Sequence, residues 1–238
     1  NIDRRDILKG LATLPVLGMF GASVWAKGNH TNKQKSTILN ELKIDAAVAP
    51  PVGSMAGDPI RLGIIGYGIR GEQLVQAAGY ASKNWLTNMK EASEKNKKDT
   101  RLKDFLDQEN LNVVFTGVCD VFDIKSEEAI EAVTTDKNKP KRYKNYMDML
   151  QSPDIDGVII ATPDHWHAPM SIEALKAGKH VYVEKPMTHN LAETLELYNV
   201  AKSSSKIFAV GHQHRQTLSF ITAQDVIKKN ILGHISMV

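Results

Sequence analysis

Short apolar runs alternate with amphipathic stretches along most of this chain. The apolar runs are rich in Val and Ile, and the stretches between them carry apolar residues at helical spacing. Strands are expected at 61–65, 113–119, 157–161, 180–183 and 207–210, and helices at 70–79, 124–133, 168–177 and 191–203. Such alternation with short connections predicts an α/β fold of the Rossmann type, a doubly wound parallel sheet with right-handed crossovers.

Charge and loss of periodicity set the remaining segments apart. Residues 82–112 are mostly charged and polar, and we expect an insertion that forms a solvated helix or loop. The expected dinucleotide-binding domain spans 59–215 and includes this insertion. Residues 27–58 show little periodicity and are interpreted as a linker or arm. Residues 216–238 are expected to begin a second, α+β domain that continues beyond Val238.

The N-terminus resembles a twin-arginine export signal. Arg4 and Arg5 precede an uncharged apolar run, and Ala26 provides a small residue for cleavage. The run is shorter than the roughly 20 residues that a spanning helix needs, so residues 1–26 are interpreted as a signal segment outside the fold. We therefore expect an exported, periplasmic protein that folds around its cofactor in the cytoplasm. An uncleaved membrane tether is the alternative.

Composition excludes some classes of protein. With 238 residues, of which 42% are hydrophobic, the chain can bury a substantial core. The formal charge of +3 is spread among interleaved acidic and basic residues, which argues against a nucleic-acid interface. The single cysteine, Cys119, lies within an expected strand and is interpreted as a buried, inert thiol.

The most informative motif is a Gly-x-Gly-x-x-Gly turn directly after the first expected strand. Gly66 would allow a sharp turn, Gly68 a close approach of backbone to a pyrophosphate, and Gly71 tight packing of the next helix on the sheet. Unpaired N–H groups at the start of that helix favour an anion. The cofactor-binding residues predicted here are Gly66, Tyr67, Gly68, Ile69, Arg70 and Gly71.

Asp120 is the candidate for the second element of a dinucleotide site. It ends the strand 113–119, and its carboxylate could accept hydrogen bonds from both hydroxyls of an adenosine ribose. Roughly fifty residues separate it from the glycines, instead of the usual twenty or so, and the insertion accounts for the difference. Its negative charge would repel a 2′-phosphate, so NAD is predicted rather than NADP. A plain turn-initiating Asp is the alternative.

Two further loops follow neighbouring strands at the same edge of the expected sheet. Ala161-Thr-Pro-Asp-His-Trp-His167 follows one strand, and Glu184-Lys185-Pro186 follows the next. Together with the glycine turn, these motifs resemble the Gfo/Idh/MocA oxidoreductase family, whose nucleotide domain carries a Thr-Pro…His loop and an Ala-Gly-Lys-His…Glu-Lys-Pro strand and turn. The resemblance runs from about Arg61 to the end of the chain.

The resemblance implies roles for individual residues. Lys185 would be the catalytic lysine, followed by a cis bond to Pro186, and its ammonium could stabilise an alkoxide or shuttle the hydroxyl proton. A second domain would supply an Asp and a His to the site, and the full-length protein would be a homo-oligomer. The cofactor-binding residues that the resemblance adds are Thr162, Pro163, His165, His167, Glu184, Lys185 and Gln213.

Two His-x-His pairs, His165/His167 and His212/His214, leave a metal site open as an alternative. Cofactor and sugar contacts account for the same positions, so no metal is predicted. Trp166 could stack on a sugar ring or simply plug a loop.

The leading functional prediction is an exported NAD-dependent oxidoreductase that acts on a sugar, a cyclitol or a glycoside. The first alternative is a redox-neutral glycoside hydrolase or lyase, in which a ring hydroxyl is oxidised transiently and the hydride is returned. The second is a non-catalytic cofactor-binding protein, against which the Glu184-Lys185-Pro186 turn argues. A small carbohydrate-like molecule is the expected partner, with no nucleic acid and no membrane contact beyond the signal segment.

Overall fold

The computed structural model describes residues 57–213 and 217–235. The chain divides into two compact units: residues 52–212 form one, and residues 1–51 with 213–238 form the other. The expected signal segment and nearly all of the expected arm lie outside the described residues.

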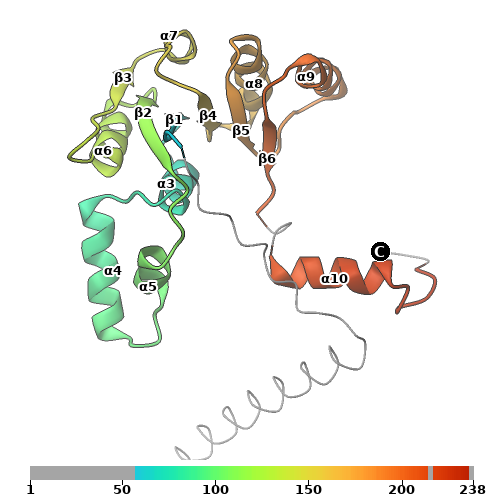
Figure 1. The fold of residues 1–238 in the computed structure, drawn as a ribbon, viewed down its shortest axis with the longest axis horizontal. Coiled ribbons are helices and arrows are strands. Elements are labelled where there is room, and N and C mark those ends of the chain that lie inside the picture. Colours follow the sequence, from blue (N-terminus) through green and yellow to red (C-terminus); the bar gives the residue numbers. More distant parts are fainter. Residues whose placement is uncertain (1–56, 214–216, 236–238) are drawn as a thin grey trace, which may run out of the picture. The chain divides into compact units, whose positions relative to one another are not determined.

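A six-stranded sheet forms the centre of the unit 52–212 (Figure 1). Its strands are β1 (Ile60–Ile65), β2 (Val113–Cys119), β3 (Lys141–Tyr143), β4 (Gly157–Ile160), β5 (His180–Glu184) and β6 (Phe208–Gly211). They lie in the order β3-β2-β1-β4-β5-β6, and every neighbouring pair is parallel. The chain therefore winds in opposite directions from β1 and from β4, which confirms the predicted Rossmann-type sheet.

Helices cover both faces of this sheet. The helical segments are α3 (Ile69–Ala77), α4 (Lys83–Lys95), α5 (Arg101–Leu106), α6 (Asp123–Val133), α7 (Tyr146–Leu150), the 3-10 turn η1 (Asp164–Trp166), α8 (His167–Lys176) and α9 (Leu191–Ser203). One core cluster joins α7, α8 and α9 to the sheet around Ile65, Leu175 and Leu197. The other joins α3 and α6 to the sheet around Ile64 and Val75. Successive residues of a strand point to opposite faces, so the two clusters lie on opposite sides.

Capping residues explain where several helices begin. Asn190 accepts a hydrogen bond from the backbone N of Glu193 (3.0 Å), and the Glu193 carboxylate accepts one from the backbone N of His189 (2.8 Å). This reciprocal pair caps α9, which spans the predicted range. Ser82 likewise accepts from the backbone N of Trp85 at 3.2 Å at the start of α4. The ends of α3, α6 and α8 differ from the prediction by at most two residues.

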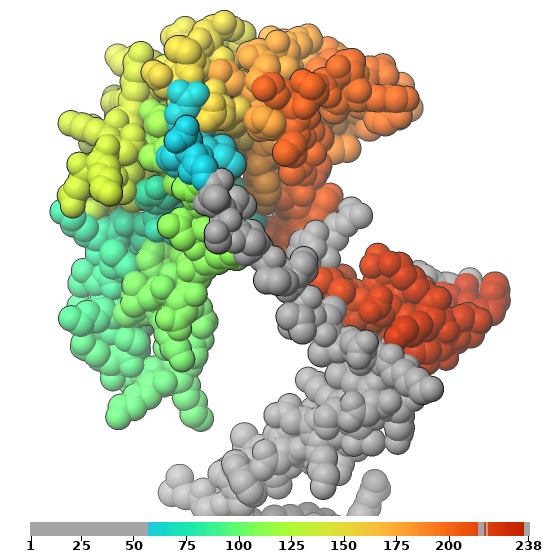
Figure 2. Space-filling view, in the orientation of Figure 1, coloured from blue at the N-terminus to red at the C-terminus, as the bar shows by residue number. Residues whose placement is uncertain are grey.

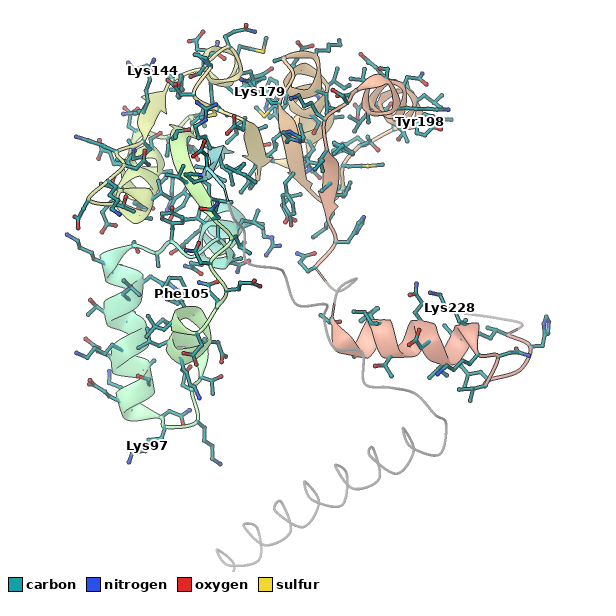
Figure 3. The ribbon with its side chains drawn as sticks, viewed as in Figure 1. Lys97, Phe105, Lys144, Lys179, Tyr198 and Lys228 are labelled. Atoms are coloured by element: carbon teal, nitrogen blue, oxygen red, sulfur yellow. The ribbon has the colours of Figure 1, made fainter. Side chains whose placement is uncertain are left out.

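The expected insertion folds as a pair of helices, α4 and α5, that lie away from the sheet (Figures 1 and 2). Neither helix contains a buried residue, in agreement with the solvated segment predicted from its charge. The rings of Trp85 and Phe105 meet edge to face with 5.0 Å between centroids, and this contact joins the two helices. Figure 3 labels Phe105 in α5 and Lys97 in the turn between the helices.

Hydrogen bonds from polar side chains stabilise the loops at the amino ends of the strands. Arg61 donates to Asp156 from its backbone N (2.8 Å), Nε (3.1 Å) and Nη2 (2.7 Å), and the side-chain hydrogen bond lowers the pKa of Asp156. Lys179, labelled in Figure 3, donates to the carbonyl oxygens of Ser152 (2.7 Å) and Ile155 (2.8 Å). Burial lowers the pKa of Lys179. These contacts leave the carboxyl ends of the strands free for other chemistry.

The second unit contains α10 (Leu218–Lys228). Residues 236–238, at the end of the expected second-domain segment, lie outside the described residues. Within 57–213 and 217–235, no helix is long and apolar enough to cross a membrane.

Asp156→Asn should destabilise the unit 52–212, because Arg61 then loses the nearer of its two carboxylate partners. The pKa of Asp156 is lowered in the folded protein, so its contribution is present above the unfolded value of 3.8 and is lost as the pH falls through the lower, folded value. Urea unfolding should therefore separate the two proteins at neutral pH and bring them together in acid. Asp154→Asn, at an exposed carboxylate 3.7 Å from Arg61, is the control and should change stability less. A separation that does not depend on pH would contradict this account.

Candidate functional site

The glycine turn joins β1 to α3 at the carboxyl edge of the sheet. Gly66 has a positive φ of 89°, and a Cβ there would lie 2.8 Å from the carbonyl oxygen of Ala161. A Cβ on Gly71 would lie 2.2 Å from the carbonyl oxygen of Gly66. Both positions therefore need glycine for the predicted reasons, which are a sharp turn at Gly66 and close helix packing at Gly71.

Gly68 differs from these two because no protein atom crowds it. Its backbone is extended, with φ −77° and ψ −168°, and a Cβ there would meet nothing within 4 Å. Gly68 is also the N-cap of α3, and no side chain caps that helix. Open space therefore lies beside uncapped N–H groups, where a pyrophosphate would be favoured.

Asp120 follows β2 and lies beside the glycine turn. Its Oδ2 accepts a hydrogen bond from the backbone N of Tyr67 at 2.7 Å, and its Oδ1 accepts one from the backbone N of Phe122 at 2.9 Å. A carboxylate has about four acceptor positions, so both oxygens keep capacity for ribose hydroxyls. The Tyr67 ring lies in the core, and its main chain faces the site. Cys119 is buried, which raises the pKa of its thiol to about 11, in keeping with the inert role predicted.

Exposed apolar side chains follow Asp120 and also occur in the glycine turn. Val121 is 88% exposed, Phe122 is 66% exposed, and Ile69 in the glycine turn is 82% exposed. Apolar surface next to open space is typical of ligand sites. The sequence reasoning included Ile69 but missed Val121 and Phe122, although an apolar pair directly after a strand-ending carboxylate was an available signal.

Arg70 and Glu184 form an ion pair between α3 and β5. Arg70 Nε donates to Glu184 Oε1 at 2.7 Å, and Glu184 is only 4% exposed. The other carboxylate oxygen accepts from the backbone N of Lys185 at 3.3 Å. A Cβ on Gly211 would lie 2.7 Å from Glu184 Oε1 and 2.4 Å from the Tyr182 hydroxyl oxygen, so a larger residue there would displace the ends of these two side chains. Tyr182 and Gly211 were missed at the sequence level, and the predicted cofactor contacts of Arg70 and Glu184 stay predictions.

Lys185 is exposed at the end of β5, and its bond to Pro186 is cis, as predicted. Among the residues that the structure describes, its Nζ has no hydrogen-bonding or ionic partner. The ammonium is therefore available to a ligand, on the residue that follows the buried Glu184.

His167 begins α8 and is 2% exposed. Its Nδ1 lies 2.6 Å from the carbonyl oxygen of Pro186, and its Nε2 lies 2.9 Å from the carbonyl oxygen of Thr162. Neither ring nitrogen is available to a cofactor in this arrangement, which differs from the direct contact predicted. Thr162 is half-buried and Pro163 is exposed, and their predicted contacts with the cofactor stay predictions.

Asp164 joins the loops after β4 and β5 at the surface, with Oδ2 3.1 Å from His189 Nε2. Desolvation acts to raise the pKa of Asp164, but the hydrogen bond and charge interaction with His189 help to lower it overall. His165 is exposed, and Trp166 is 42% exposed, with its ring 6.3 Å from that of Tyr146. His165 and Trp166 are thus accessible to a ligand.

His165 and His167 do not come together as a pair of metal ligands. His165 is exposed, whereas His167 is buried and engaged by backbone carbonyls. No group of three or more His, Cys, Asp or Glu side chains is placed to hold a metal ion within 57–213 and 217–235. His214 and Arg215 lie outside the described residues. Gln213 belongs to the other unit, so its contact with the cofactor stays a prediction.

Comparison with known proteins identifies the family. Residues 60–212 match the Gfo/Idh/MocA family, described as an oxidoreductase family with an NAD-binding Rossmann fold. The chain belongs to this family. The match confirms the predicted resemblance, and it agrees with the predicted cofactor, NAD.

Curated relatives of this Gfo/Idh/MocA chain include a hydrolase. A glycosyl hydrolase family 109 protein of Shewanella putrefaciens is 28% identical over 211 residues, which are 87% of this chain and 38% of that protein. The uncharacterized oxidoreductase YdgJ of Escherichia coli is 36% identical over 88 residues, which are 37% of this chain and 25% of that protein. The chain thus spans well under half the length of these relatives.

Solved structures with the same fold include inositol dehydrogenases. The myo-inositol 2-dehydrogenase of Lactobacillus plantarum has a TM-score of 0.56 and 24% identity, over 75% of this chain and 43% of that chain. The scyllo-inositol dehydrogenase of Lactobacillus casei, with bound NAD(H) and scyllo-inositol, has a TM-score of 0.55 and 20% identity, over 75% of this chain and 44% of that chain. At these identities the likeness shows the fold alone.

Gly68→Ala should weaken NAD binding without lowering stability, whereas Gly71→Ala should lower stability itself. At Gly68 an alanine is compatible with the backbone angles and meets no protein atom, so stability should stay within about 0.5 kcal/mol. NAD affinity should fall about tenfold or more, because the methyl group takes the space meant for the pyrophosphate. At Gly71 the Cβ meets the Gly66 carbonyl oxygen at 2.2 Å, so the melting temperature should fall even without NAD. Calorimetric titration and thermal unfolding measure both. Wild-type NAD affinity in Gly68→Ala would place the pyrophosphate elsewhere.

Proposed function

We propose that the full-length protein is an NAD-dependent oxidoreductase that transfers hydride between the cofactor and a hydroxyl-bearing carbon of a sugar, cyclitol or glycoside. The observation that carries this proposal is the convergence of three loops at one edge of the sheet. They are the glycine turn after β1, the loop Thr162–His167 after β4, and the turn at Lys185 after β5. β1, β4 and β5 are adjacent and parallel, so their carboxyl ends meet at this edge.

The residues at this edge fit a dinucleotide. The open space at Gly68, beside the uncapped start of α3, would take the pyrophosphate. Asp120 would accept the hydroxyls of the adenosine ribose, and the exposed side chains of Val121 and Phe122 would cover the adenine. The exposed Lys185 would then face the nicotinamide end. The carboxylate of Asp120 favours NAD over a cofactor with a 2′-phosphate.

Lys185 is the residue best placed to assist removal of the hydroxyl proton in this reaction. NAD, when bound, supplies the hydride acceptor. The hydroxyl proton must leave as the hydride leaves, and the Nζ of Lys185 would stabilise the resulting negative charge on oxygen or pass the proton on. The neighbouring charges of Arg70 and Glu184 compensate each other at 2.7 Å. The unpartnered ammonium of Lys185 therefore supplies the net positive charge at this position.

A redox-neutral glycoside hydrolase or lyase is the second candidate. The observation that favours it is the 28% identity, over 87% of this chain, to a glycosyl hydrolase family 109 protein. In this chemistry a ring hydroxyl is oxidised to a ketone, which acidifies the neighbouring C–H so that the glycosidic oxygen can be eliminated. Water adds in the hydrolase, and the hydride is returned to the ketone. Lys185 would serve both reactions, because each begins with loss of the same hydroxyl proton.

Steady-state assays of the full-length protein test the proposal and separate the two candidates. Cyclitols and aryl glycosides would be supplied with excess NAD, and NADH and the released aryl alcohol would be followed together. Net oxidation requires NADH to accumulate in step with substrate loss. Redox-neutral chemistry requires aryl alcohol to accumulate over many turnovers with no net NADH. Neither product with any substrate would favour the non-catalytic cofactor-binding protein.

We propose in addition that the protein is exported by the twin-arginine route. The support is the sequence of Arg4 and Arg5 before an uncharged apolar run, which lies outside the described residues. Changing both arginines to lysine should keep the full-length protein in the cytoplasm, as measured by cell fractionation. Lys9→Gln is the control and should still be exported. An unchanged periplasmic fraction in the double lysine variant would contradict the proposal.

Lys185→Met should lower the hydride-transfer rate of the full-length protein by about 10²–10⁴-fold, the usual contribution of a positioned acid or base. Methionine has a similar apolar stem, so NAD affinity should stay within about tenfold. Lys185→Arg should not restore the rate, because a guanidinium keeps its proton at neutral pH. Stopped-flow absorbance of NADH measures the step. The control is Lys202→Met, at an exposed lysine of α9 that lies 5.6 Å from the Tyr198 ring centroid, and its rate should match wild type. A normal rate in Lys185→Met would remove the lysine from catalysis.

A further inference from the structure

The two loops that carry Thr162 and Lys185 are joined by one buried side chain. His167 Nε2 lies 2.9 Å from the carbonyl oxygen of Thr162, in the loop after β4. His167 Nδ1 lies 2.6 Å from the carbonyl oxygen of Pro186, the residue directly after Lys185. Since β4 and β5 are neighbours in the sheet, the imidazole spans the gap between the two strand ends. The ring is 2% exposed, so water does not compete for these contacts.

The chemistry of the contacts shows what this ring must donate. A carbonyl oxygen can only accept a hydrogen bond, so a ring nitrogen that bonds to it must carry a hydrogen. The neutral ring carries one N–H, and the tautomer decides which of the two contacts is that hydrogen bond. With either tautomer the buried ring is bonded to the main chain of one loop and packs against the main chain of the other.

The position of Lys185 depends on its main chain. Among the described residues its Nζ has no partner, so no side-chain bond holds the ammonium in place. The turn is held instead by the hydrogen bond from Lys185 N to Glu184 (3.3 Å) and by the contact of Pro186 with His167. The contact of Pro186 with His167 is the shorter of the two, at 2.6 Å, and the same His167 ring also contacts the loop of Thr162.

We propose that His167 is a positioning residue for the hydride-transfer step. By contacting both loops, it fixes the Lys185–Pro186 turn against the loop at Thr162 and so sets where the ammonium lies relative to the bound cofactor. This inference rests on the proposed function, which gives Lys185 its catalytic role. It replaces the direct cofactor contact that the sequence predicted for His167.

A second contact between the same loops is less suited to this task. His189 and Asp164 meet at 3.1 Å, but their side chains are 42% and 51% exposed. Exposed ion pairs of this kind contribute little, because water competes for both partners. The buried bonds of His167 to main-chain atoms therefore carry the constraint.

A double-mutant cycle in the full-length, NAD-loaded protein tests the inference. His167→Gln keeps a hydrogen-bond donor but loses the ring that contacts both loops. In an otherwise wild-type protein it should lower the hydride-transfer rate about 10²-fold, the cost of moving a catalytic group by about 1 Å. In Lys185→Met no ammonium remains to be positioned, so the same substitution should lower the residual rate by less than about twofold. A merely structural role would produce the same loss in both proteins.

The matched control is His180→Gln. His180 Nδ1 accepts a single hydrogen bond from the backbone N of Ile207 at 3.0 Å, at the amino end of β5. Its loss should leave the hydride-transfer rate within about twofold of each parent protein. Should His167→Gln fail to fold, nitrogen-15 NMR of the wild-type protein provides an independent measurement. A ring nitrogen of His167 should carry a slowly exchanging hydrogen, since the ring is buried.

Each other outcome counts against the inference. Equal losses in the two parent proteins would mean that His167 acts independently of Lys185. A normal rate in His167→Gln, or an NMR spectrum in which no ring hydrogen of His167 exchanges slowly, would remove the bridge itself. A normal rate in Lys185→Met alone would overturn the proposed function, and this inference with it. That outcome is measured in a protein with wild-type His167, so the two failures can be told apart.

Discussion

The parallel pairing of β1 with β4 is the constraint on which the whole site depends. These strands lie side by side from Leu62 with Gly157 to Ile65 with Ile160, and the connections from them wind away in opposite directions. Such a reversal leaves a space at the carboxyl ends of the strands that no crossover helix fills. It also brings two turns so close together that Gly66 can have no side chain beside Ala161. The same pairing that opens the site therefore dictates the glycine beside it.

Features set by local sequence could be predicted. Five of the six strands could be located, because their buried residues, such as Ile64 and Ile65, form continuous apolar runs, and both faces of the sheet are covered. The short strand β3 was not predicted, because Lys141–Tyr143 contains no such run. The glycine turn could be interpreted residue by residue because steric limits at Gly66 and Gly71 arise within the turn and its immediate neighbours. Asp120 was recognisable despite its unusual spacing, since the intervening segment is visibly different in composition.

Features set by long-range contacts could not be predicted. Arg70 and Glu184 are 114 positions apart. A buried charged residue needs a partner of opposite charge, but the sequence does not show which residue that partner is. Histidine is a residue type that often binds ligands, so the sequence suggested that role for His167. Its burial between two backbone carbonyls follows only from how β4 and β5 are placed. The helical pair α4 and α5 was concealed for a similar reason, because its apolar contact between Trp85 and Phe105 is made within a mostly charged segment.

The chain enters and leaves that helical pair at almost the same point of the domain. Tyr80, before α4, donates a hydrogen bond from its hydroxyl to the carbonyl oxygen of Val113, the first residue of β2, at 2.8 Å. Where the ends of a segment are held together, the entropy of closing it rises only slowly with its length. The segment between Tyr80 and Val113 can thus grow, shrink or change its surface at small cost to the sheet. New external surface can therefore be added at this segment, while the dinucleotide-binding edge of the sheet stays unchanged.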